Sequence, residues 1–93
     1  MVISMSKKLH IAGYDFVRTC TAAPEQYDVY KDGEYFLYFR VRYGHFTVQT
    51  DCLGEYVYSS YIRGWENFLD DERGHFLVEG LKAGIEYYKN KDS

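Results

Sequence analysis

The dipeptide Asp32-Gly33 constrains the fold of this chain more than any other feature of its sequence. It lies between two runs in which apolar and polar residues alternate, residues 26–31 and 34–43. Asp-Gly supplies the positive φ angles that a two-residue type I′ turn requires, so the sequence predicts a β-hairpin here. Gly44-His45 and residues 51–54 mark further reversals. They separate two more predicted strands, 46–50 and 55–59, and the four strands form an antiparallel meander.

A C-terminal amphipathic helix is predicted over residues 71–89, after a loop at 61–69. Leu77, Leu81 and Tyr88 recur at helical spacing along one face. Gly80 and Gly84 each cost the helix about 1 kcal/mol relative to alanine, which we interpret as a close approach to the sheet. The alternative is a weak helix that frays.

The predicted fold class is α+β: an antiparallel β-meander of four or five strands with one C-terminal α-helix packed on one face. We expect a disordered N-terminus over residues 1–8, a single domain over 9–90 and a tail over 91–93. Residues 9–21 are weakly extended, with a short strand predicted at 15–21. No apolar run is long enough to span a membrane and no secretory signal is evident, so the expected location is cytoplasmic.

Period-two counting divides the predicted strands between two faces of the sheet. The face that matches the apolar stripe of the helix collects Tyr27, Val29, Tyr35, Leu37, Phe39, Val41, Phe46, Val48 and Val57. The opposite face carries rings and guanidinium groups in place of the mixed polar side chains of an ordinary solvated sheet. Its residues are Tyr30, Phe36, Tyr38, Arg40, Arg42, Thr47, Gln49, Tyr56 and Tyr58.

Three arrangements remain open for this second face. Residues 9–21 fold over it, a partner covers it, or it stays exposed. The composition makes the question important, because the 93 residues include 11 tyrosines, six phenylalanines and one tryptophan. Tyrosine suits half-buried strand positions and contact surfaces better than the centre of a core.

The remaining polar residues have structural explanations. The cluster from Asp70 to Arg73 is interpreted as a helix cap that complements the helix dipole, rather than as paired carboxylates for acid and base catalysis or for a metal. The three histidines lack the spacing of metal ligands, and no nucleotide-binding or hydrolase motif is present. Cys20 and Cys52 are expected to be reduced and partly buried. We therefore predict no enzyme activity, no cofactor and no metal.

The predicted function is that of a protein-interaction module, which binds a partner or itself through Tyr30, Phe36, Tyr38, Arg40, Arg42, Tyr56 and Tyr58. Tyrosine and arginine dominate binding hot spots in protein interfaces. Single-stranded nucleic acid is the alternative partner, since bases stack on rings while cations contact phosphates. The net charge of −3 opposes a general binder of polyanions.

Two short runs carry a resemblance, Arg40 to Phe46 and Phe68 to Arg73. Together they resemble small uncharacterised proteins of bacteria and their phages or other mobile elements, over about residues 27–88. The resemblance implies a small bacterial or phage protein and no particular activity.

Overall fold

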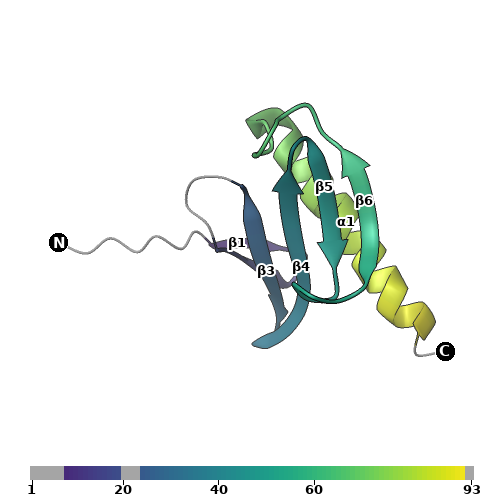
Figure 1. Cartoon of the computed structure of the whole chain (residues 1–93). Helices are drawn as coiled ribbons and strands as arrows, with labels where there is room; N and C mark the ends of the chain where they lie inside the picture. Colours follow the sequence, from purple (N-terminus) through teal and green to yellow (C-terminus); the bar gives the residue numbers. More distant parts are fainter. Residues whose placement is uncertain (1–7, 20–23, 92–93) are drawn as a thin grey trace.

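The computed structural model describes residues 8–19 and 24–91, which form a sheet of six strands and one helix (Figure 1). The elements are β1 (Lys8–Ile11), β2 (Tyr14–Arg18), β3 (Gln26–Lys31), β4 (Glu34–Arg42), β5 (His45–Gln49), β6 (Tyr56–Tyr61) and α1 (Asp70–Lys91). The strands lie in sequence order and every neighbouring pair is antiparallel. The α+β class, the meander and the C-terminal helix are confirmed. The predicted four or five strands are wrong, because β1 and β2 add a complete hairpin.

Three of the hairpins close through the same kind of turn. Each turn consists of one ordinary residue and one glycine, both with positive φ: Ala12-Gly13, Asp32-Gly33 and Tyr43-Gly44. Positive φ at both positions defines the type I′ turn, whose twist matches that of the flanking strands. The predicted hairpin at Asp32-Gly33 is confirmed. The next reversal comes one residue earlier than predicted, so that His45 begins β5.

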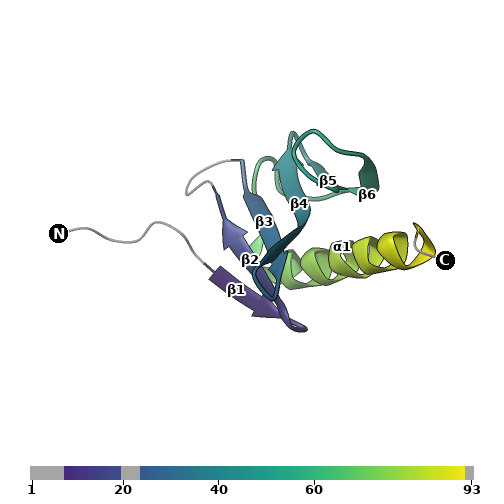
Figure 2. The same cartoon turned by 90° about the horizontal axis from the view of Figure 1, so that it is seen from below.

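The N-terminal hairpin extends the sheet and does not cover its second face. β2 pairs with β3, and the sheet curves so that β1 and β2 turn toward the side on which α1 lies (Figure 2). Phe16 of β2 is fully buried, and its ring lies 5.1 Å from that of Phe39. Of the three arrangements left open for the second face, the one in which residues 9–21 fold over it is therefore excluded for residues 9–19, because β2 has an apolar residue to bury on the helix side. Residues 20 and 21 lie outside the described residues.

The inner face of the sheet, which packs against α1, holds the core. Seven of the nine residues predicted there are buried: Tyr27, Val29, Leu37, Phe39, Val41, Phe46 and Val48. Val57 is half-buried and packs against them. Phe16, Phe68, Leu77 and Leu81 complete the cluster.

Tyr35, predicted in the core, is instead 42% exposed on the outer face, the face opposite α1. In the register of β3 with β4, Val29 pairs with Leu37 and Tyr30 with Tyr35, so Phe36 is an extra residue without a partner. This β-bulge shifts the alternation by one position. Phe36 and Leu37 consequently both face inward, and Tyr35 faces outward.

A second bulge shifts the alternation in β6. Val48 pairs with Tyr58 and Gln49 with Tyr56, which leaves Val57 unpaired. Tyr58 therefore faces inward, where its ring contacts that of Phe46 at 5.9 Å. The placement of Phe36 and Tyr58 on the outer face is wrong for the same reason, since period-two counting assumes a strand without an extra residue.

The two helix glycines approach the sheet closely, as predicted. A Cβ atom added to Gly80 would lie 2.9 Å from Phe39 Cε2, and one added to Gly84 would lie 2.3 Å from Leu37 Cδ1. Both distances are shorter than an ordinary carbon contact of about 3.5–4.0 Å. The glycines therefore allow α1, which is 22 residues long, to lie against the inner face.

The ends of the described fold lie slightly outside the predicted domain of residues 9–90. β1 begins at Lys8 and α1 ends at Lys91, whereas the rest of the expected disordered N-terminus and of the tail lies outside the described residues. Cys52 is a free, exposed cysteine and is not partly buried, because it lies in the turn between β5 and β6. In the described ranges, no helix combines the length and the apolar character that crossing a membrane requires.

Candidate functional site

The outer face brings four of the seven predicted binding residues together, namely Tyr38, Arg40, Arg42 and Tyr56. Cross-strand pairing places Arg42 beside His45, and Arg40 beside Thr47. Tyr38 and Tyr56 both pair with Gln49, from opposite sides. Tyr30 also lies on this face, but at the other end of β4, where its ring contacts that of Tyr35 at 5.5 Å. Phe36 and Tyr58 belong to the inner face.

An open pocket of about 210 Å³ lies on this part of the outer face. Strands β4, β5 and β6 and the turn between β4 and β5 supply its lining: Arg40, Arg42, Tyr43, His45, Thr47 and Tyr56. Two guanidinium groups, an imidazole and two kinds of hydroxyl group thus surround one hollow. Among the described residues, no carboxylate belongs to the lining.

Arg40 and Arg42 lack the anionic partners that the arginines of the loop and helix have. Neither lies within ion-pair distance of a carboxylate in the described part of the chain, whereas Arg63 and Arg73 both pair with acids. The Nε atom of Arg40 is also buried without a hydrogen-bond partner there. A buried donor left unpaired costs about 1–3 kcal/mol. Since the Arg40 Nε is shielded from solvent, the capacity of the pair to bind an acceptor from outside rests on its two positive charges, which no carboxylate of the described residues neutralises at ion-pair distance.

Aromatic rings surround the two arginines. The Arg42 guanidinium lies 5.1 Å from the centre of the Tyr43 ring, within the range of a cation–π contact. Tyr43 in turn contacts Trp65 at 5.6 Å, and His45 stacks on Tyr61 at 4.9 Å. Tyr43, Tyr61 and Trp65 are exposed, as is Tyr56 at 69%. Rigid rings at the surface next to unpaired cations are typical of a contact surface.

Tyr38 lies deeper in the face and fixes the surroundings of Arg40. Its hydroxyl donates a hydrogen bond of 3.0 Å to Gln26 Oε1. Burial raises the pKa of the Tyr38 hydroxyl, and the nearby positive charge of Arg40 opposes that shift. Tyr38 therefore stays protonated and acts as a hydrogen-bond donor at neutral pH.

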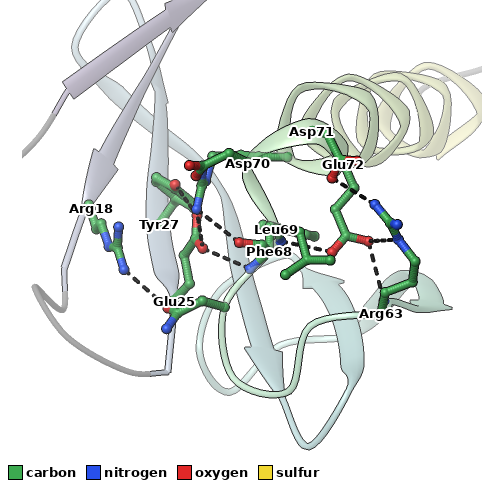
Figure 3. Close-up of polar contacts among 11 residues, drawn as sticks. Arg18, Glu25, Tyr27, Arg63, Phe68, Leu69, Asp70, Asp71 and Glu72 are labelled. Atoms are coloured by element: carbon green, nitrogen blue, oxygen red, sulfur yellow. Dashed lines mark hydrogen bonds and ion pairs between the residues drawn. The ribbon is translucent and has the colours of Figure 1, made fainter.

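A second polar cluster surrounds the fully buried carboxylate of Glu25, on the side of α1 (Figure 3). Arg73 donates from Nε to Oε2 at 2.7 Å and from Nη2 to Oε1 at 3.1 Å. The Phe68 amide donates to Oε1 at 2.9 Å, and the Tyr27 hydroxyl donates to Oε2. Although burial opposes ionisation of Glu25, these hydrogen bonds and the charge of Arg73 keep its pKa below the ordinary value. Glu25 is therefore ionised and fully bonded.

Glu72 joins the loop before α1 to the first turn of the helix. Its carboxylate accepts hydrogen bonds from the backbone amides of Leu69 at 2.8 Å and of Gly64 and Arg63 at 3.3 Å (Figure 3). The bond to Leu69 is the return half of a capping box, in which the third helical residue satisfies the amide of the cap. Arg63 also pairs with Asp71 at 2.6 Å. The interpretation of the cluster from Asp70 to Arg73 as a helix cap is confirmed.

The chemistry of the two clusters differs. Arg73 also donates to Asp70 and to the Phe68 carbonyl, so it joins Glu25 to the first turn of α1 and to the loop before it. Within residues 8–19 and 24–91, no group of three or more histidine, cysteine, aspartate or glutamate side chains is placed to hold a metal ion. The Glu25 cluster thus fixes the loop and helix against the sheet, whereas the two arginines of the outer face have no such partners among the described residues.

Sequence reasoning did not place Tyr43, His45 and Thr47 among the binding residues, and it missed Glu25. The sequence does contain a signal for Tyr43, His45 and Thr47. Gly44 marks a turn, and a turn sets the register of the two strands that it joins. Glu25 offers no local signal, since its partner Arg73 is 48 positions away.

We compared the chain with protein-family models, with curated proteins and with solved structures, and none of these comparisons found a significant match. The resemblance to small bacterial and phage proteins therefore stays a prediction. The function has to be argued from the geometry of the chain itself.

Proposed function

We propose that the protein is a non-enzymatic interaction module that binds an acidic partner protein through its outer sheet face. Arg40 and Arg42, which pair with no carboxylate of residues 8–19 and 24–91, carry this proposal. Tyr38, Tyr43 and Tyr56 supply the adjoining rings. The proposal includes the expected cytoplasmic location.

Interface energetics favours this use of the face. Arginine and tyrosine provide large contact areas and directed hydrogen bonds, and they dominate the hot spots of protein interfaces. Electrostatic complementarity then selects a partner that presents anionic groups to the two guanidiniums.

Affinity capture from cell extract tests the proposal, using the native chain and the double variant Arg40→Glu, Arg42→Glu. The matched control is Lys82→Glu, Lys89→Glu, which reverses two exposed charges on α1. We expect a specific partner that the native chain and the control retain and the arginine variant loses. Equal capture by all three proteins would contradict the proposal, provided that circular dichroism and thermal unfolding show the variants to be folded.

Single-stranded nucleic acid is the second candidate, because four exposed rings lie near the arginines: Tyr43, Tyr56, Tyr61 and Trp65. A stacked base contributes about 1–3 kcal/mol to binding. Filter binding of oligonucleotides at two salt concentrations tests this candidate, since contacts to phosphates weaken as salt rises. Absence of salt-dependent retention would eliminate it.

A further inference from the structure

We propose that the pocket lined by Arg40, Arg42, His45, Thr47 and Tyr56 binds a phosphate group carried by the partner protein. The inference rests on the proposed function and deepens it, because it names the chemical group that the partner presents to the outer face.

The positions of the donors favour an oxyanion in this pocket. Arg40 and Arg42 are two residues apart on β4, so their side chains project from the same face of the sheet. Thr47, on the neighbouring strand, pairs with Arg40 and brings a hydroxyl to the same pocket. Tyr56 contributes a phenolic hydroxyl from the third strand. Donors therefore surround the pocket on three strands, and no carboxylate in its lining competes for them.

The number of donors favours phosphate over carboxylate. One guanidinium fork already satisfies the two oxygens and the single charge of a carboxylate. A phosphate monoester has three terminal oxygens and carries a charge of about −1.5 to −2 at neutral pH, which matches two guanidiniums and a hydroxyl.

The charge pattern favours a protein as the carrier of the phosphate. Single-stranded nucleic acid presents one phosphate per nucleotide and calls for a basic track along the surface. Here the arginine pair is isolated, because Asp28 lies on the same face in register with Tyr38 and the whole chain has a net charge of −3. A single phosphorylated side chain requires only the pocket.

Nuclear magnetic resonance titration of the full chain with inorganic phosphate tests the inference, with acetate at matched ionic strength as the control. We expect saturable shifts of the pocket amides with phosphate and weaker, non-saturating shifts with acetate. Arg40→Gln and Arg42→Gln each lower the phosphate affinity by about 10- to 100-fold, as expected for the loss of charge-assisted hydrogen bonds. Thr47→Val lowers it less, and Lys82→Gln leaves it unchanged. Equal responses to phosphate and acetate, or full affinity in both arginine variants, would overturn the inference.

Two further probes identify the carrier. A short glycine peptide with one phosphoserine is compared with its unphosphorylated form and with a ten-nucleotide oligothymidylate. We expect the phosphopeptide to bind in the pocket and the unphosphorylated peptide not to bind. Tighter binding of the oligonucleotide than of the phosphopeptide would overturn the assignment to a protein.

The two proposals fail in different ways. If the chain captures a partner through Arg40 and Arg42 but does not bind phosphate, the module stands and the phosphate pocket is wrong. If phosphate binds in the pocket but the arginine variants capture the same proteins as the native chain, the pocket stands and the proposed function is wrong.

Discussion

The substitution Gly84→Ala tests how closely α1 lies against the sheet. In an unpacked helix, this change stabilises the fold by about 1 kcal/mol, because alanine has the higher helix propensity. Here the added Cβ lies 2.3 Å from Leu37 Cδ1 and 3.1 Å from Leu37 Cγ. Leu37 is fully buried, so it cannot move away without disturbing the core. Overpacking of this kind costs about 1–3 kcal/mol.

The overlap of more than 1 Å with an ordinary carbon contact places Gly84→Ala at the upper end of that range. Subtracting the gain in propensity leaves a net loss of about 2 kcal/mol in the free energy of unfolding. The matched control is Gly74→Ala, in the same helix, where an added Cβ meets nothing within 4 Å. That variant is expected to gain about 1 kcal/mol.

Urea unfolding and thermal unfolding, both followed by circular dichroism, compare the two variants with the native chain. For a domain of this size 1 kcal/mol corresponds to about 4–8 °C in Tm, so Gly84→Ala melts roughly 8–16 °C lower and Gly74→Ala roughly 4–8 °C higher. A Gly84→Ala protein as stable as the native chain would refute the argument from close packing.

Four further substitutions test the Glu25 cluster, the bulge in β4 and the turn between β3 and β4. Glu25→Gln lowers the free energy of unfolding by about 3 kcal/mol, because Arg73 loses its carboxylate. In the native chain the pKa of Glu25 is lower in the folded than in the unfolded state, so Glu25 contributes stability that is lost as pH falls below 4.5, the ordinary pKa of a glutamate. Glu25→Gln lacks this contribution, and unchanged acid unfolding of the variant would contradict the reasoning. Phe36→Ala lowers the free energy of unfolding by about 2–3 kcal/mol and Tyr56→Ala by less than about 0.5 kcal/mol in the same urea assay. Equal losses would contradict the assignment of Phe36 to the inner face and of Tyr56 to the outer face. Gly33→Ala lowers the free energy of unfolding by about 1–2 kcal/mol, because alanine is strained at the φ of +85°. Nothing lies within 4 Å of the added Cβ, so the backbone alone causes the loss. An unchanged urea midpoint would refute this.

The parts of the fold that depend on local sequence were predictable. Asp32-Gly33 indicates its turn through the backbone preferences of two residues. Arg40 and Arg42 were placed correctly, because they lie beyond the bulge in β4, where alternation is regular. Gly80 and Gly84 revealed a close approach, since glycine in a helix interior otherwise only costs stability.

The rest depends on pairing between distant segments. The bulges at Phe36 and Val57 arise from the register of two strands, and a count along one strand contains no information on its neighbour. Tyr35, Phe36 and Tyr58 were assigned to the wrong faces for that reason. The bond between Glu25 and Arg73 joins residues that no local pattern connects.

Helix α1, which covers the inner face of the sheet, follows the last strand along the chain, and this order has a consequence during synthesis. The last strand ends at Tyr61 and α1 ends at Lys91, so the ribosome adds a further 30 residues after the sheet is complete. At about 5–20 residues per second this takes roughly 1.5–6 s. Until α1 has been made and has left the ribosome, the inner face of the sheet lacks its cover, and Glu25 has not yet met Arg73. A chaperone that shields apolar β-structure until α1 packs would therefore raise the yield of this protein.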